Sequence, residues 1–303
     1  MKRRLPAGEM ILLLAALIWG SSFVAQSLGS EHVGSFTYNG VRSLIGAFVL
    51  ALAAGLISAK TGKRPDREEY KRLITGGCIC GVLLFAAVNS QQVAIAWKDS
   101  AGNKALIAKV GFLTTLYIVL VPVIGMLFGK KTGLRMWISL GISLLGAYLM
   151  TDGAMGRFTG GDLFAVLCAV MFALQILAVD FFAPGADCLR LSMVQFAVCG
   201  FLSMIAAFIW ETPALSGILQ AKWALLYSGV MSSGIAYTLQ MVGQKRCKPQ
   251  LASLIMSLES VFCALCGFVF LKEKMSVPEL IGCTLMMGAV VLAQIQKEEN
   301  EQE

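Results

Sequence analysis

The chain has 303 residues, of which 57% are hydrophobic and 14% are charged, and its mean hydropathy is +0.74. A soluble domain averages about 25% charged residues, so this chain has too few polar side chains to cover a water-facing globule. The net charge of +7 raises the question of a nucleic-acid partner, which the placement of the charges answers below.

Apolar segments of about twenty residues, ten in all, follow one another along the chain. A hydrocarbon core about 30 Å thick needs roughly 20 apolar residues per helical crossing, so each segment predicts a transmembrane helix. The charged stretch 98–109 is either an extended loop or the start of a longer fourth helix. The predicted helices are 9–28, 34–58, 73–96, 104–128, 134–151, 161–180, 189–210, 223–243, 250–271 and 277–296. We therefore predict an all-α integral membrane protein without a β-sheet, surrounded by the lipid bilayer.

The basic residues favour one side of these helices. Lys2, Arg3 and Arg4 precede the first helix and no A-x-A-like cleavage site follows it, so we interpret it as a retained helix rather than a signal peptide. With a cytoplasmic N-terminus, seventeen Lys and Arg lie in inner segments and six in outer ones. This bias follows the positive-inside rule and places both termini, with the charged tail 297–303, in the cytoplasm. The charge is thus a topology signal, and no nucleic-acid partner is expected.

The two halves of the chain resemble each other. Five helices per half is an odd number, so the second half must enter the membrane from the opposite side, as in inverted-repeat transporters. The paired motifs are Gly8-Glu9 with Gly161-Asp162, and Gly125-Met126-Leu127-Phe128 with Gly267-Phe268-Val269-Phe270. We therefore predict ten transmembrane helices in two inverted five-helix repeats, at 8–151 and 160–296, with the substrate near the midplane between them.

The sequence lacks the signatures of a metal centre or an enzyme. Cys263-x-x-Cys266 lies in an apolar helix without a nearby histidine, and we interpret both cysteines as small packing residues. The single histidine, His32, lies in a short predicted loop without other ligand residues. No P-loop, G-x-S-x-G motif or His-rich loop is present. We therefore expect no metal, no cofactor and no catalytic residues.

Several motifs together resemble a known family. Trp19-Gly20-Ser21-Ser22-Phe23 is similar to the opening of the first helix in EamA-type transporters of the drug/metabolite transporter superfamily. Arg42 matches an arginine that is common in the second helix of that family. Ser257 to Phe262, followed by Lys272-Glu273-Lys274, resembles the signature of the ninth helix, with Ser260 where proline is usual.

The resemblance implies a function as well as a fold. It implies secondary active transport by alternating access, in the export direction, of small organic metabolites or drugs across the inner or plasma membrane. The alternative is an ion-independent uniporter of amino acids or related solutes. The expected partner is a small-molecule substrate, bound by a monomer or a homodimer.

Polar uncharged side chains concentrate in the first, second, third, sixth, seventh and eighth predicted helices. Ser233, Tyr237 and Gln240 recur at helical spacing and so share one helix face. We expect these six helices to form most of the wall of a solvated cavity, with the other four packed together as a scaffold. The expected pathway residues are Trp19, Ser22, Gln26, Tyr38, Asn39, Arg42, Asn89, Gln91, Gln175, Gln195, Ser233, Tyr237 and Gln240. For any one of them the alternative is an interhelical hydrogen bond, worth about 0.6 kcal/mol on average.

Three charged residues stand out inside the predicted helices, where insertion of a charge costs about 2.5–3.5 kcal/mol. Arg42 either contacts the substrate or has a structural role, in which it pairs with Glu259 or satisfies carbonyl groups. Glu259 is either a proton carrier for coupled transport or the counter-ion of Arg42. Lys109, close to the start of its helix, is expected to extend its ammonium group outward to water.

Overall fold

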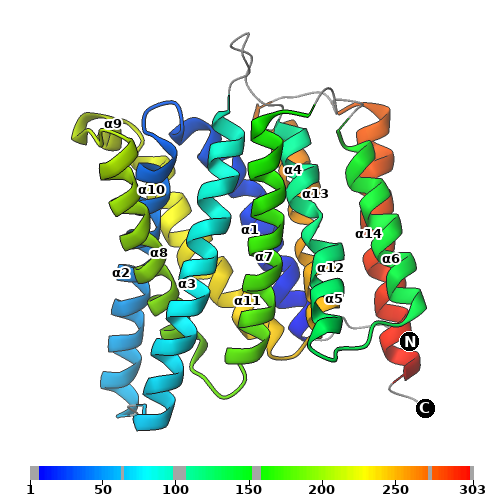
Figure 1. Cartoon of the computed structure of the whole chain (residues 1–303), viewed down its shortest axis with the longest axis horizontal. Coiled ribbons are helices and arrows are strands. Elements are labelled where there is room, and N and C mark those ends of the chain that lie inside the picture. The colour runs from blue at the N-terminus through cyan, green and yellow to red at the C-terminus, as the bar shows by residue number, and fades with distance from the viewer. Residues whose placement is uncertain (1–6, 63–64, 98–106, 152–157, 272–274, 301–303) are drawn as a thin grey trace.

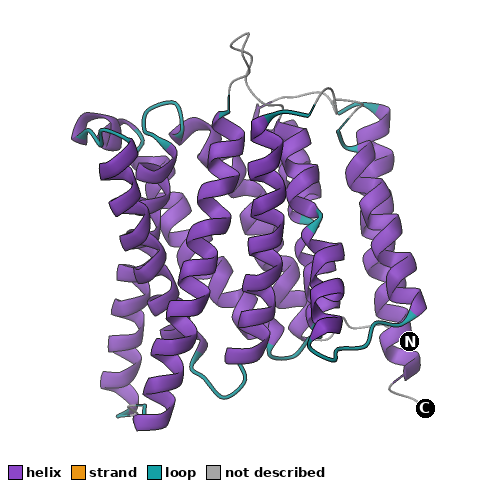
Figure 2. Ribbon diagram, viewed as in Figure 1, coloured by secondary structure: helices purple, strands orange, loops and turns teal. Residues whose placement is uncertain are grey.

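Helices make up the regular structure of the protein. The computed structural model describes residues 7–62, 65–97, 107–151, 158–271 and 275–300. Within these ranges the helices stand side by side (Figure 1), and no strand is present among them (Figure 2). The apolar length of most of these helices confirms the predicted class, an all-α protein of the membrane.

The elements follow one another in a simple order along the chain. Those of the first half are α1 (Ala7–Gly29), α2 (Ser35–Thr61), α3 (Arg67–Ala96), α4 (Ile107–Thr115), α5 (Tyr117–Leu127) and α6 (Leu134–Leu149). Those of the second half are α7 (Gly160–Phe182), α8 (Cys188–Trp210), α9 (Leu215–Gln220), α10 (Lys222–Tyr227), η1 (Ser228–Ala236), α11 (Tyr237–Gln244), α12 (Pro249–Met256), α13 (Glu259–Cys266), η2 (Gly267–Leu271) and α14 (Val277–Asn300). The two η elements are π-helical segments.

Eight described helical stretches are long and apolar enough to cross a membrane. All ten predicted segments are mostly helical where they are described, but two of them fall outside this set. The first is α6, which is apolar but only 16 residues long. The second is the run from α10 to α11, which η1 divides into shorter pieces. Length and composition therefore identify eight crossings among the described residues and do not confirm the predicted ten.

The outer faces of the helices carry large apolar side chains. Phe48 of α2 is 64% exposed, Leu56 of the same helix is 73% exposed and Phe208 of α8 is 71% exposed. Contiguous apolar surface of this kind is rare on soluble monomers and suits contact with lipid tails. The bundle is therefore apolar on the outside, as the composition predicts.

Local signals in the sequence set several helix ends. The Asp66 carboxylate accepts a hydrogen bond from the Glu69 N–H (2.8 Å) at the start of α3, and Asp187 accepts one from the Leu189 N–H (2.9 Å) at the start of α8. Such caps satisfy N–H groups that lack a partner within the helix. Gly62 ends α2 with a positive φ of 67°, a conformation that favours glycine.

Glycines bring α2 of the first half against α8 of the second half in a reciprocal pattern. A Cβ placed on Gly40 of α2 would lie 2.6 Å from the Met204 sulfur of α8. A Cβ placed on Gly200 of α8 would lie 2.9 Å from the Leu44 side chain of α2. Each glycine therefore receives a large side chain from the residue four positions after the other glycine, as small residues allow in membrane helices.

The pair α6 and α14, which forms one edge of the bundle in Figure 1, repeats this pattern. A Cβ on Gly146 would lie 2.8 Å from the Met286 side chain, and a Cβ on Gly282 would lie 2.7 Å from the Met150 side chain. The two glycines also face each other, since each such Cβ would lie within 2.7 Å of the other glycine's carbonyl oxygen. The contact of α2 with α8 and the contact of α6 with α14 are therefore both reciprocal.

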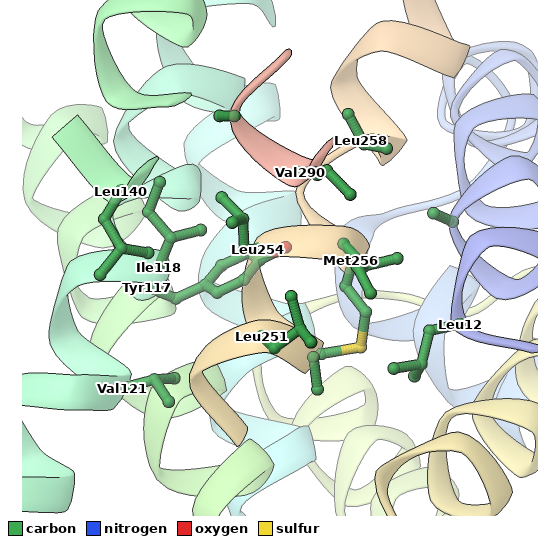
Figure 3. Packing of buried hydrophobic residues seen from close by; sticks show 14 of the residues in the cluster. Leu12, Tyr117, Ile118, Val121, Leu140, Leu251, Leu254, Met256, Leu258 and Val290 are labelled. Atoms are coloured by element: carbon green, nitrogen blue, oxygen red, sulfur yellow. The ribbon is translucent and has the colours of Figure 1, made fainter. Parts of the chain in front are cut away.

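An apolar core fills the space between α1, α5, α6, α7, α12 and α14. In Figure 3 the α12 side chains of Leu251, Leu254 and Met256 lie between Tyr117 of α5 and Leu12 of α1. Most of this core comes from the fourth, fifth, ninth and tenth predicted helices. These helices therefore pack together, and the core supports the cavity described next.

Candidate functional site

Two helices are interrupted inside the bundle. A turn at Leu116 separates α4 from α5, and a turn at residues 257–258 separates α12 from α13. Figure 1 shows α4 above α5 and α13 above α12 in the same part of the bundle. The hydroxyl oxygens of Thr115 and Ser260 lie 3.5 Å apart, so the two interruptions are neighbours. Irregular backbone at membrane depth is tolerated where it is buried in protein or lines a water-filled cavity.

A cavity lies beside these interruptions, and the helix starts at Tyr117 and Glu259 contribute to its wall. Many of the residues singled out from the sequence line it. These are Trp19, Gln26, Arg42, Gln91, Gln175, Tyr237, Gln240 and Glu259. The cavity is therefore lined by both halves of the chain, as expected for a site between two repeats.

The remaining lining residues were not predicted. They are Phe23, Tyr117, Phe172, Ile176, Ser232 and Met256. The fourth and ninth helices, which were expected to pack as scaffold, also contribute Tyr117, Met256 and Glu259 to the cavity wall. A turn within a helix changes the direction of the face that follows it, and this brings residues of a packed helix to the cavity. The sequence signal for these interruptions was a pair of hydroxyl residues in each of two largely apolar helices. The pairs are Thr114 with Thr115, and Ser257 with Ser260.

Other predicted pathway residues lie outside the cavity wall. They are Ser22, Tyr38, Asn39, Asn89, Gln195 and Ser233. The Asn39 amide donates to Asn89 Oδ1 (3.2 Å), and the Asn89 amide donates to the Ser203 hydroxyl (2.8 Å), which joins α2, α3 and α8. The Tyr38 hydroxyl lies 2.7 Å from the Ser228 hydroxyl. Tyr38, Asn39 and Asn89 therefore form the interhelical hydrogen bonds that were the alternative to a pathway role.

The π-helical segment η1 explains why Ser232, and not Ser233, faces the cavity. A π-helix bonds residue i to residue i+5 and so turns more slowly per residue than an α-helix. The α-helical spacing that groups Ser233 with Tyr237 and Gln240 therefore fails across η1. Ser233 instead packs against α2, where a Cβ placed on Gly46 would lie 2.7 Å from its Cβ.

A chain of buried glutamines forms one wall of the cavity. The Gln240 amide donates to Gln175 Oε1 (3.2 Å) and to Gln244 Oε1 (3.0 Å). The Gln175 amide donates to Gln195 Oε1 (3.1 Å), and the Gln244 amide donates to the Ile176 carbonyl (3.1 Å). This chain links α7, α8 and α11. It fixes the orientation of Gln175 and Gln240, with Gln195 as a support behind the wall.

Aromatic rings form another part of the wall. The rings of Trp19 and Tyr237 meet edge to face with their centres 4.7 Å apart. Phe196 of α8 packs on the same Tyr237 ring, with centres 5.1 Å apart. Such edge-to-face pairs hold rings in defined orientations, so the wall offers rigid aromatic surface beside the glutamine amides.

Two charged residues, Arg42 and Glu259, line the cavity without touching each other. Arg42 is 5% exposed, and its guanidinium carbon lies 5.7 Å from the centre of the Tyr38 ring. Glu259 is half-buried. Among the described residues, no ion pair within 4.0 Å joins the two. The direct pairing of Arg42 with Glu259, one of the alternatives for these residues, is therefore not formed.

Contrary to the expectation from the sequence, Lys109 does not extend outward to water. Its ammonium group donates to the Asp162 carboxylate at the start of α7 (2.7 Å), and both side chains are buried. The Asp162 carboxylate also accepts a hydrogen bond from the Thr159 N–H (2.6 Å) and so caps α7. Of the stretch 98–109, predicted as either loop or helix, residues 98–106 lie outside the described residues, and α4 begins at Ile107.

Known proteins share this architecture along almost the whole chain. The sequence model of the EamA-like transporter family matches residues 6–152 and 159–294. The chain belongs to the EamA-like transporter family. The resemblance found in the sequence is thereby confirmed. Within this family the protein is a multi-pass membrane transporter.

Individual relatives support the same assignment. An uncharacterized transporter of Archaeoglobus fulgidus is 25% identical over 291 residues, which are 95% of this chain and 86% of the relative. The uncharacterized inner membrane transporter YedA of Escherichia coli K12 is 25% identical over 296 residues, which are 93% of this chain and 88% of YedA. A solved crystal structure that is 21% identical superimposes with a TM-score of 0.75 and covers 97% of this chain and 99% of its own. The fold is therefore shared over almost the whole chain.

Proposed function

We propose that this EamA-like protein is a secondary active transporter that exports small organic metabolites or drugs across the inner or plasma membrane by alternating access. The observation that carries the proposal is the cavity between the two halves. Its wall combines amide groups, hydroxyl groups and aromatic rings with one cationic and one carboxylate side chain. Substrate sites of inverted-repeat transporters lie at the interface of the repeats and are formed by interrupted helices.

The proposal includes ten crossings in two inverted repeats, at 8–151 and 160–296. The reciprocal glycine contacts of α2 with α8 and of α6 with α14 support it, because a two-fold axis between the repeats produces such pairs. The helix interruptions support it as well. Leu116 lies nine residues before Gly125, and Leu258 lies nine residues before the matching Gly267.

The order of packing between helices supports the same relation. The contact of α3 with α7 corresponds to that of α1 with α11, and the contact of α5 with α7 corresponds to that of α1 with α13. In addition, α1 begins and α14 ends at the same end of the bundle (Figure 1), as an even number of crossings requires. With the positive-inside bias, the proposal places both termini in the cytoplasm.

The deciding experiment is counterflow with purified protein in liposomes. Metabolites that change in the medium of an overexpressing strain supply the candidate substrates. Liposomes loaded with an unlabelled candidate should transiently accumulate the labelled compound above its external concentration, and the rate should saturate. A channel conducts both species independently and gives no such overshoot, so saturable counterflow separates a carrier from a channel. Absence of counterflow for every exported compound would contradict the proposal.

Coupling is proposed to run through Glu259, the carboxylate on the cavity wall. An inward or outward pH gradient should then drive accumulation in wild-type liposomes, and Glu259→Gln should abolish this response. Glu259→Asp, which keeps the ionisable group, is the matched control. Accumulation by Glu259→Gln that still follows the pH gradient would remove this role. Counterflow by wild-type protein without any response to ion gradients would instead favour the uniporter.

A further inference from the structure

The cavity wall carries polar atoms that no protein group satisfies. Within the described part of the chain, Trp19 Nε1 and Arg42 Nε are buried donors without a partner, and the Oε1 atoms of Gln26 and Gln240 are buried acceptors without one. Arg42, Gln26 and Gln240 are 5%, 6% and 2% exposed, and all four residues line the cavity. Buried polar groups without hydrogen bonds are rare because they cost free energy. Together they indicate a ligand that offers both acceptors and donors.

The charges on the same wall give the ligand a more specific chemistry. Arg42 and Glu259 are the charged residues among those that line the cavity. Their charged atoms lie more than 4.0 Å apart, and the described structure shows no ion pair for either of them. A cation and a carboxylate that share a cavity without neutralising each other match a ligand that carries one charge of each sign.

We propose that the cavity binds a small zwitterion, with its carboxylate group on Arg42 and its ammonium group on Glu259. This rests on the proposed transport function and names the substrate class. The guanidinium group presents donors in a planar fork that fits a carboxylate, and the Trp19 indole N–H is a further donor. The ammonium group has three donors for the Glu259 carboxylate and the amide oxygens of Gln26 and Gln240.

Substrates with a single charge fit the cavity less well. A cation bound at Glu259 leaves the buried Arg42 without a counter-ion, and an anion bound at Arg42 leaves the half-buried Glu259 without one. An uncompensated charge in a desolvated site is strongly unfavourable. A zwitterion compensates both charges and adds no net charge to the cavity.

The test compares three matched series of compounds on the purified full-length protein. The first series consists of L-amino acids with uncharged side chains. The second consists of their amides, which are cations, and the third of their N-acetyl derivatives, which are anions. Thermal unfolding in detergent measures binding at millimolar ligand. At least one amino acid should raise the unfolding temperature of wild type, and its amide and N-acetyl derivative should bind about tenfold more weakly or worse, since a hydrogen-bonding site rejects analogues that lack a partner group.

Two single substitutions should switch the preference. Arg42→Gln should favour the amide over the parent amino acid, and Glu259→Gln should favour the N-acetyl derivative. Lys60→Gln and Glu68→Gln change the net charge equally on exposed residues outside the cavity, and both should keep the wild-type preference. The readout is a change in ligand order, so a variant of lower stability still gives an answer.

The outcomes separate this proposal from the transport function. If no amino acid binds, or if an amide or N-acetyl derivative binds as well as its parent, the zwitterion site is wrong. If counterflow in liposomes then still occurs with a neutral or singly charged compound, the transport function stands without it. If an amino acid binds with the expected switches but no counterflow occurs for any compound, the transport function fails and the binding site stands.

Discussion

At the scale of single residues, the pair of Lys109 and Asp162 shows how the protein buries charge. The Asp162 carboxylate receives the Lys109 ammonium group at 2.7 Å and the Thr159 N–H at 2.6 Å, so it caps α7 and neutralises a lysine of α4 at once. The side chains are 10% and 2% exposed. One carboxylate therefore connects the two halves of the chain at this end of the bundle.

Removal of one partner of this pair should be costly. In Asp162→Asn, Lys109 loses its ion pair with this carboxylate, and the loss for a broken buried pair is about 3–5 kcal/mol. We expect a clearly lower unfolding temperature in detergent. The double variant Lys109→Met/Asp162→Asn, which removes both charges, should recover part of the loss. An unfolding temperature of Asp162→Asn equal to that of wild type would show that the pair does not contribute.

At the scale of elements, the contact of α2 with η1 places Arg42 at the cavity. A Cβ on Gly229 of η1 would lie 2.7 Å from the Ile45 Cβ and 2.9 Å from the Arg42 carbonyl oxygen. Gly46 of α2 faces the same segment, with Ser233 at 2.7 Å and the Gly229 carbonyl oxygen at 3.0 Å. The two glycines therefore allow backbone approach between the halves, next to a π-helical segment of the kind that often marks functional sites.

Two glycines of α2 give a matched comparison. Gly46→Ala should push η1 away from α2, since overpacking costs about 1–3 kcal/mol, and should lower both the unfolding temperature and the counterflow rate. Gly55 lies in the same helix with nothing within 4 Å of an added Cβ. Gly55→Ala should therefore keep the rate and the stability or raise the stability slightly. Equal behaviour of the two variants in unfolding and counterflow assays would mean that the close contact is unimportant.

At the scale of the whole molecule, the proposed direction of the bundle in the membrane rests on charge placement and helix count. The loop after α2 lies between Thr61 and Arg67 and is flanked by basic residues, whereas the loop after α1 contains Glu31 and His32. The positive-inside rule assigns the first loop to the cytoplasm and the second to the outside. The two loops stand at opposite ends of α2, so one labelling experiment addresses both.

Single cysteines at exposed positions should report the orientation. In a background without the nine native cysteines, Glu31→Cys should react with a membrane-impermeant thiol reagent added to intact cells. Thr61→Cys should react only after the membrane is opened. Both positions are exposed in the structure, so burial does not explain a missing signal. Labelling of Thr61→Cys from outside in intact cells would reverse the proposed topology.

The sequence predicted much of the fold because each helix carries its own signal. Twenty-residue apolar runs identify membrane helices without reference to neighbours, and motifs such as Trp19 to Phe23 identify the family. Charged and amide residues in those runs, such as Arg42, Gln175 and Glu259, are costly enough in lipid to reveal that they face the interior. Their inward orientation could thus be predicted.

The sequence could not separate the cavity wall from the polar contacts behind it. Asn39 and Gln195 look like Gln91 and Gln240 in the sequence, but hydrogen bonds between helices turn the first two away from the cavity. Which amide meets which depends on helix rotation and crossing, properties that a single segment does not encode.

Composition and the length of the apolar segments by themselves determined the membrane class and the helical segments, because these depend on transfer from water to lipid. The family was indicated by the resemblance of short motifs. Tertiary structure decided the rest. The turns at Leu116 and Leu258 bring Tyr117 and Glu259 to the cavity wall. The π-helical segment η1 turns Ser232 toward the cavity in place of Ser233, and Lys109 forms an ion pair with Asp162 instead of reaching water. The physical reason is the same in each case: the position of a side chain depends on backbone geometry and on partners far away in the sequence, which only the packed bundle brings together.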